Sequence, residues 1–147
     1  MSPTKAVRLT EAHLDDVAEL EQLSFGEPWS KTALSLLTGE EALGFVCLED
    51  GRAVAYGGMM LAPDEAQVTN IATHPDFRRR GLAREVTGAL IREAQQRGLE
   101  QIVLEVRASN EGAIALYRAL GFEQVGVRRR FYRAPTEDAL VMIKRLI

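Results

Sequence analysis

Two neighbouring segments between residues 77 and 122 have the residue types and spacing that a chemical site requires. The first is a basic turn, Arg78-Arg79-Arg80-Gly81, which opens into a helical pattern. The second begins with Glu105, after an apolar run, and continues to Tyr117 in the next helical segment. A basic turn before a helix suits a phosphate group, and a carboxylate and a phenol can accept and donate protons.

The basic turn has the features of an anion-binding helix start. The amides that open a helix are unpaired and lie at the positive end of its dipole, and Gly81 lets the backbone approach a pyrophosphate closely. The arginines add positive charge. A nucleic-acid role is the rival interpretation of the triple arginine. The net charge of −3 and the lack of an aromatic platform argue against it.

Glu105 is the candidate general base. We expect the strand over 102–106 to be buried on both faces, where an unpaired carboxylate is costly. Sites in α/β sheets gather at the carboxyl ends of strands, where Glu105 should lie. The alternative is a structural charge at the strand end, paired with Arg107 across one intervening residue.

Tyr117 is the candidate general acid, because a phenol with a pKa near 10 keeps its proton at neutral pH. It stands at helical spacing among apolar residues, so the alternative is a tyrosine of the core. Asn110 can cap the helix that contains Tyr117. Trp29 can be a simple core anchor.

Hydrophobic spacing predicts the elements that position these residues. Asp50-Gly51 is a strong hairpin signal, and Gly98 and Gly121 can end helices. The expected helices cover 10–23, 30–37, 82–97 and 110–120, and the expected strands lie near 6–9, 44–49, 53–61, 67–73, 102–106, 123–130 and 139–145. This order predicts an α/β or α+β fold with a mixed sheet.

The bulk properties are those of one globular domain over residues 1–147, with 46% apolar and 27% charged residues. No apolar run approaches the roughly 20 residues that cross a bilayer, and the first residues lack the apolar core of a signal peptide. The single cysteine, Cys47, lies in an apolar run and is expected to be buried. We therefore expect a cytoplasmic protein.

The charge is distributed unevenly along the chain. Residues 1–77 carry 4 basic and 13 acidic side chains, a balance of −9, whereas residues 78–133 carry 12 arginines and 6 acidic side chains, a balance of +6. Such a division suggests one part that meets an anion and another that meets a cation. The alternative is chance segregation of solvated charges.

The two segments resemble the GCN5-related N-acetyltransferase (GNAT) superfamily, whose members move an acetyl group from acetyl-CoA to an amine. The likeness rests on 78–83, 104–110 and 113–122, and it extends to 28–30, 70–72 and 137–139. Ala83 stands where many relatives have a second glycine. Within the superfamily the chain looks most like the bacterial enzymes that acetylate the amino-terminal alanine of ribosomal protein S18. The resemblance implies a mostly antiparallel sheet of about six to seven strands flanked by about four helices.

The resemblance also implies roles for individual residues. Glu105 would be the base, and Tyr117 would give its proton to the coenzyme sulfur. Asn110 would form a hydrogen bond to the coenzyme, and this is compatible with a capped helix if Ser109 takes the cap. The further implied contacts to acetyl-CoA are Ile71, Ala72 and Thr73, through the backbone, and Arg79, Arg80, Gly81, Leu82, Ala83 and Arg84. Trp29 and Tyr132 would line the groove for the acceptor peptide.

The implied reaction is a direct transfer, without a metal or a covalent enzyme intermediate, to the amino terminus of a protein. No contact with nucleic acid or membrane is expected. Two other hypotheses keep the same coenzyme site. One is an acetyltransferase for lysine side chains or a small amine, and the other is a non-catalytic module that binds acyl-CoA.

Overall fold

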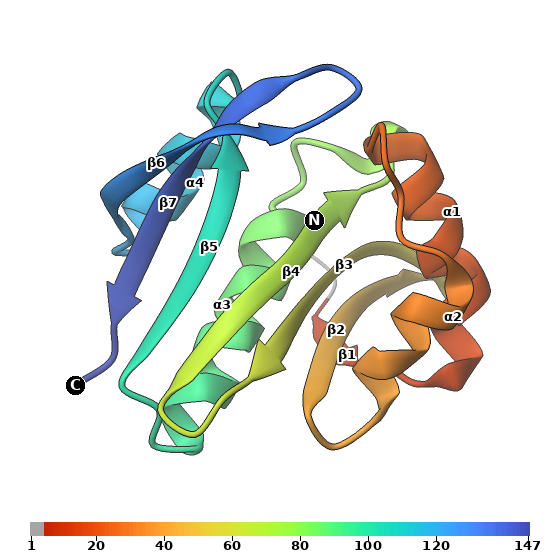
Figure 1. The fold of residues 1–147 in the computed structure, drawn as a ribbon. Helices are drawn as coiled ribbons and strands as arrows, with labels where there is room; N and C mark the ends of the chain where they lie inside the picture. The colour runs from red at the N-terminus through yellow and green to blue at the C-terminus, as the bar shows by residue number, and fades with distance from the viewer. Residues whose placement is uncertain (1–4) are drawn as a thin grey trace.

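A seven-stranded sheet in the order β1-β2-β3-β4-β5-β7-β6 forms the centre of the computed structural model, which describes residues 5–147 (Figure 1). All neighbouring strands are antiparallel except β4 and β5, which are parallel. The strands are β1 (Ala6–Arg8), β2 (Ala42–Glu49), β3 (Arg52–Leu61), β4 (Glu65–Thr73), β5 (Gln101–Arg107), β6 (Glu123–Tyr132) and β7 (Glu137–Arg145). The predicted mixed, mostly antiparallel sheet is confirmed.

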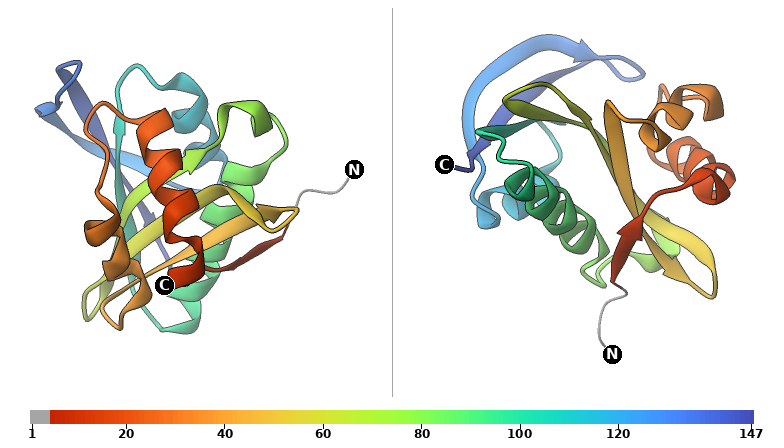
Figure 2. Two further views of the ribbon diagram at one scale, coloured as in Figure 1. Left: turned by 90° about the vertical axis from the view of Figure 1, so that its right-hand side faces the viewer. Right: turned by 90° about the horizontal axis from the view of Figure 1, so that it is seen from below.

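The four α-helices of the described residues cover the two faces of the sheet in pairs. Figure 2 shows α1 and α2 against one face and α3 and α4 against the other. The helices are α1 (Leu14–Ser24), α2 (Lys31–Leu34), α3 (Leu82–Gln96) and α4 (Glu111–Ala119), with 3-10 turns at η1 (Glu11–His13), η2 (Ser35–Thr38) and η3 (Pro75–Phe77). The helix predicted over 30–37 is therefore the short α2 followed by η2. Its predicted cap is confirmed, because the Ser30 hydroxyl accepts a hydrogen bond from the Ala33 N–H at 3.1 Å.

Each face of the sheet has its own apolar core. Leu20, Leu34 and Val46 are fully buried beneath α1 and α2. Beneath α3 and α4 the core includes Leu90 and Ile102. Within residues 5–147, no helix combines the length and apolar character needed to span a bilayer. These two clusters lie on opposite faces of the sheet, and a third buried cluster in the described residues includes Val54 of β3 and Leu82 and Val86 of α3.

One detail of the predicted burial is wrong. The side chains of β5 alternate, with Ile102, Leu104 and Val106 buried and Val103 and Glu105 only half-buried. The strand is therefore covered on the α3–α4 face alone. Its other face is part of the wall of a cleft, and this leaves Glu105 accessible.

Candidate active site

The cleft lies where β4 and β5 separate. Their pairing covers only three residues of each strand, 65–67 on β4 and 101–103 on β5. Beyond these residues β4 stays paired with β3, and β5 stays paired with β7 as far as residue 107. The two strands therefore diverge toward their carboxyl ends and leave a gap between them (Figure 1).

A bulge in β4 lies at the start of this gap. Position 57 of β3 faces position 71, but position 59 faces position 68, so β4 has one extra residue between these pairs. The N–H of His74 then donates to the Val54 carbonyl of β3 at 2.8 Å. Because hydrogen-bonding groups alternate in direction along a strand, the N–H groups of Ile71 and Thr73 point away from β3. Ala72 instead directs its N–H to β3.

The predicted phosphate turn forms the start of α3. Gly81 precedes the helix with a φ of 78°, a left-handed conformation that favours glycine. The Glu85 N–H donates to the Gly81 carbonyl at 3.0 Å. The N–H groups of Leu82, Ala83 and Arg84 precede this bond and have no partner within the helix. Three amides at the positive end of the α3 dipole are therefore available to bind an anion.

The arginines around the turn are exposed, and only one of them is held by a carboxylate in the described part of the chain. Arg80 lies 3.5 Å from Glu49, and its guanidinium lies 4.9 Å from the centre of the Phe77 ring. The ion pairs within residues 5–147 do not include Arg79 or Arg84. These two side chains keep their charge available to a phosphate group.

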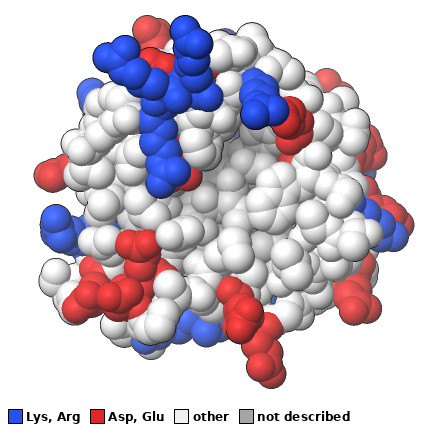
Figure 3. Space-filling view, viewed as in Figure 1, with Lys and Arg blue, Asp and Glu red and all other residues white. Residues whose placement is uncertain are grey.

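Two adjoining cavities occupy the gap between the strands. The larger has a volume of about 340 Å³ and the smaller about 130 Å³. Figure 3 shows a hollow in this face, with Lys and Arg side chains gathered above it. Glu105, Asn70 and Tyr132 line both cavities, Trp29 lines the larger, and Tyr117, Asn110 and Ile71 line the smaller. The structure thus brings both predicted catalytic residues and both predicted acceptor residues to one place.

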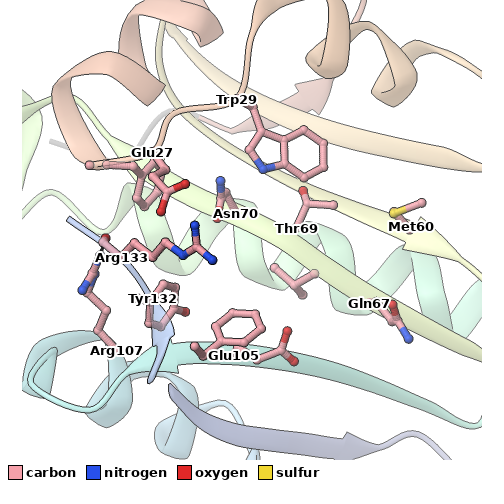
Figure 4. Close-up of a pocket in the computed structure, with 14 residues that line it drawn as sticks. Glu27, Trp29, Met60, Gln67, Thr69, Asn70, Glu105, Arg107, Tyr132 and Arg133 are labelled. Atoms are coloured by element: carbon pink, nitrogen blue, oxygen red, sulfur yellow. Dashed lines mark hydrogen bonds between the residues drawn. The ribbon is translucent and has the colours of Figure 1, made fainter. Parts of the chain in front are cut away.

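Glu105 stands between the two cavities and is not held by Arg107. The Arg107 guanidinium instead lies 3.2 Å from Glu137 and donates to the carbonyls of Pro135 and Arg133, each at 2.9 Å. The structural alternative for Glu105, an ion pair with its neighbour on the strand, therefore has no support in the described contacts. Its carboxylate is directed into the cleft with the Tyr132 ring nearby (Figure 4).

Tyr117 is almost fully buried, with 8% of its surface exposed, and it still lines the smaller cavity. Burial, followed by the nearby Tyr132, raises the pKa of its phenol well above the usual 10. Its ring packs 5.8 Å from the ring of Phe122. The phenol is therefore protonated throughout the neutral range and able to donate. A core position and a chemical role are compatible here.

Asn110 is both the helix cap and a residue of the smaller cavity. Its Oδ1 accepts a hydrogen bond from the Ala113 N–H at 3.2 Å, which caps α4. The cap is therefore not left to Ser109, whose N–H donates to Glu137 at 2.6 Å. Since the cap uses only Oδ1, the Nδ2 group of Asn110 remains available to a ligand.

Arg107 fastens the loop between β6 and β7 over the cleft. Besides its bonds to the loop carbonyls, its guanidinium lies 4.5 Å from the centre of the Tyr132 ring. Burial, with a further contribution from Glu105, raises the pKa of Tyr132 to about 12, and Arg107 opposes this rise. The Tyr132 phenol is therefore neutral, and the ring is held as part of the cavity wall.

The same loop meets the segment between α1 and α2. A Cβ atom at Gly26 would collide with the Ala134 carbonyl, so the two backbones are in direct contact. Both residues adjoin cavity-lining segments, which include Trp29 on one side and Tyr132 on the other. The two loops therefore close the larger cavity on one side.

Glu21 is the residue that sequence reasoning missed. It is fully buried on α1 and accepts hydrogen bonds from the Trp29 N–H at 2.7 Å, from Asn70 Nδ2 at 3.0 Å and from the Tyr56 hydroxyl. The spacing of α1 contained a signal for this position. Glu21 lies four residues after Val17, on the inner face of the helix, where a carboxylate needs partners.

The likeness to known proteins agrees with this geometry. The acetyltransferase (GNAT) family matches residues 14–122. The [ribosomal protein bS18]-alanine N-acetyltransferase of Escherichia coli K12 is 41% identical over 127 residues, 84% of each chain. The putative [ribosomal protein bS18]-alanine N-acetyltransferase of Bacillus subtilis 168 is 34% identical over 131 residues, 88% of this chain and 87% of the relative.

Among solved structures, the ribosomal-protein-S18-alanine N-acetyltransferase from Escherichia coli superimposes with a TM-score of 0.88 at 36% identity. The match covers 97% of this chain and 93% of that one. The family match spans well over half of the sequence, and the relatives and the fold agree with it. The chain therefore belongs to the GNAT family of acetyltransferases.

Proposed function

We propose that this enzyme transfers the acetyl group of acetyl-CoA to the amino-terminal α-amino group of a protein, and that its acceptor is the amino-terminal alanine of ribosomal protein S18. The observation that carries the proposal is the meeting of Glu105 and Tyr117 at one cavity where β4 and β5 separate. The activity for which the relatives at 41% and 34% identity are named supports the choice of acceptor. Action on a ribosomal protein would place the enzyme in the cytoplasm.

The fit of acetyl-CoA follows from the donors on the two sides of the gap. The amides of residues 82–84, together with Arg79 and Arg84, would bind the pyrophosphate. The exposed N–H groups of Ile71 and Thr73 would bind the pantetheine and acetyl portion. Bound acetyl-CoA supplies a thioester that an amine can attack. The same N–H groups of β4 would stabilise the negative charge that develops on the carbonyl oxygen of the thioester.

Glu105 and Tyr117 would divide the proton transfers. Glu105 accepts a proton from the attacking amine, directly or through a water molecule, and Tyr117 donates to the departing sulfur. Both side chains line the same cavity, and the raised pKa of Tyr117 keeps its proton in place until the sulfur leaves. Neither step requires a metal ion.

Two considerations favour an α-amine over a lysine side chain. An α-amino group has a pKa of about 7.7–8.0, whereas lysine, near 10.4, costs about 3.4 kcal/mol more to deprotonate. The contact between Gly26 and Ala134 also closes one side of the larger cavity. A chain end fits such a cavity more readily than a side chain in the middle of a polypeptide.

Release of coenzyme thiol, with the product site located by mass spectrometry, tests the proposal. Three acceptors are compared: a peptide with the amino-terminal sequence of S18, the same peptide with a blocked terminus and a lysine, and a polyamine. We expect acetylation only at the free alanine terminus. Transfer to lysine or polyamine would overturn the acceptor, and binding of acetyl-CoA without any transfer would favour a non-catalytic module.

A further inference from the structure

We propose that Asn70 binds the acceptor amine through its side-chain Oδ1, and that the buried Glu21 holds the Asn70 amide in the orientation that presents this oxygen. The proposal rests on the function proposed above, since it concerns the amine that attacks the thioester. It assigns Asn70 a direct contact with substrate, and it makes Glu21 a positioning residue that acts through Asn70.

Glu21 determines which end of the Asn70 amide faces it. An ionised carboxylate has only acceptor atoms, so it binds the NH₂ end of an amide and not the oxygen. In the structure Asn70 Nδ2 donates to Glu21 at 3.0 Å, and the Tyr56 hydroxyl donates to the same carboxylate oxygen. The Trp29 N–H occupies the other oxygen at 2.7 Å. The fully buried carboxylate therefore accepts three hydrogen bonds, of which the one from Asn70 alone acts on the Asn70 amide.

The other end of the Asn70 amide faces the cleft. The two terminal atoms of an amide diverge, so Oδ1 is turned away from Glu21, and no hydrogen bond within residues 5–147 uses it. Oδ1 is also not among the buried polar atoms without a partner, which are the hydroxyl oxygens of Ser24 and Thr69. Asn70 lines both cavities, on the β4 wall, and Glu105 lines both from β5 (Figure 4). An acceptor oxygen is thus exposed on the wall that faces the base.

The chemistry of the attacking amine calls for such a second acceptor. A neutral primary amine has two N–H groups and one lone pair in a tetrahedral arrangement. When Glu105 accepts one N–H and Asn70 Oδ1 accepts the other, the lone pair is directed along the remaining direction, toward the thioester carbon. As the N–C bond forms and the C–S bond breaks, one proton passes to Glu105 and the sulfur receives the proton of Tyr117. Asn70 exchanges no proton and keeps the second N–H in place.

This arrangement predicts that the enzyme prefers acceptor peptides whose neutral terminal amine has two N–H groups over those with one. A peptide that begins with N-methylalanine has only one N–H when its amine is neutral, so it cannot bind Glu105 and Asn70 together. The added methyl group would also meet the Asn70 oxygen in place of a hydrogen-bond donor. The wild-type enzyme should therefore transfer acetyl groups to this peptide at least tenfold more slowly than to the alanine peptide.

Steady-state kinetics of four variants with both peptides tests the proposal. Asn70→Ala removes the acceptor oxygen and should lower kcat/KM for the alanine peptide about tenfold or more, with the KM for acetyl-CoA unchanged. Glu21→Gln should have a similar effect, because its own NH₂ group would bind Oδ1 and turn the Asn70 amide around. The double variant Glu21→Gln/Asn70→Ala should be no slower than Asn70→Ala alone.

Tyr56→Phe is the matched control. It removes a donor from the same Glu21 oxygen, in the core and outside both cavities, but leaves the bond between Asn70 and Glu21. It should lower the melting temperature with kcat/KM close to that of the wild type. With the N-methylalanine peptide, Asn70→Ala should lower kcat/KM less than threefold, because this peptide lacks the N–H group that would bind the Asn70 oxygen.

The possible outcomes separate this proposal from the function on which it rests. Failure of the wild-type enzyme to acetylate any α-amine would overturn the function. Normal wild-type transfer with an unaffected Asn70→Ala variant would overturn the role of Asn70 alone. Equal losses in Tyr56→Phe and Glu21→Gln, or additive losses in the double variant, would reduce Glu21 to a structural residue of the core.

Discussion

Replacement of Arg107 by alanine should release the loop between β6 and β7 from the acceptor cavity. Arg107 donates to the carbonyls of Pro135 and Arg133 and stacks on the ring of Tyr132. These contacts lead from β5, which carries the base, to the end of β6 and to the loop that follows it. Without them the loop would keep its hairpin connection but lose its attachment to the cleft.

The magnitude follows from the bonds that the substitution removes. A hydrogen bond from a charged donor contributes about 1.5 kcal/mol at the low end of its range, and the stacking on Tyr132 adds about 0.5 kcal/mol. Water can replace part of this stabilisation in the variant, since 24% of the Arg107 side chain is exposed. We therefore expect a loss of about 2–3 kcal/mol in the free energy of unfolding. For a chain of this size, that is a fall in Tm of about 5–10 °C.

Two assays check this prediction. Calorimetry measures the fall in Tm, and steady-state kinetics should show a KM for the acceptor peptide raised about tenfold with little change in the KM for acetyl-CoA. Arg118→Ala is the control, because Arg118 is exposed on α4 and forms no ion pair within the described chain. It should change stability by less than about 0.5 kcal/mol. An unchanged acceptor KM in Arg107→Ala would refute the claim that Arg107 holds the acceptor site.

Three further outcomes follow from the site. Glu105→Gln should lower turnover by about 10²–10⁴-fold at saturating substrates, and an unchanged rate would remove Glu105 as the base. Tyr117→Phe should lower turnover less than Glu105→Gln does. Because the pKa of Tyr117 is raised above 10, deprotonation of Tyr117 should cause no decline in the kcat/KM of the wild-type enzyme up to pH 10. The Ser109 N–H and Arg107 hold the pKa of Glu137 in the folded protein below its usual 4.5. The ionised Glu137 carboxylate therefore stabilises the fold above pH 4.5, and this stabilisation is lost as the pH falls through the lowered pKa. The Tm difference between wild type and Glu137→Gln should accordingly be larger at pH 7 than at pH 3; equal differences would contradict this sign.

Local patterns in the sequence were sufficient to predict most of the elements and the phosphate turn. The spacing of apolar residues predicted α3 almost to its observed ends, and Asp50-Gly51 predicted the β2–β3 hairpin, where both residues have positive φ. The left-handed Gly81 at the start of α3 is likewise a property of neighbouring residues. Such features are predictable because their causes lie within a few positions along the chain.

Features that depend on distant parts of the chain were predicted less well. The half-exposure of Glu105 results from the divergence of β4 and β5, which no local pattern contains. The partner of Arg107 is Glu137, 30 residues away, and not the neighbouring glutamate. The Ser109 N–H is bound by Glu137, which lies 28 residues away on β7. Each case was decided by a contact that only the folded sheet creates.

The position of β7 has a consequence for the order in which the enzyme forms. This strand follows both β5 and β6 along the sequence, yet it lies between them, with Val141 opposite Glu105. While the protein is being synthesised, β5 has no neighbour on that side, and β6 has nothing to pair with, until residues 137–145 have emerged. The nascent chain would therefore expose two unpaired strand edges and lack a positioned base. Acetyltransferase activity should arise in a single late step, when β7 inserts between two strands that were made before it.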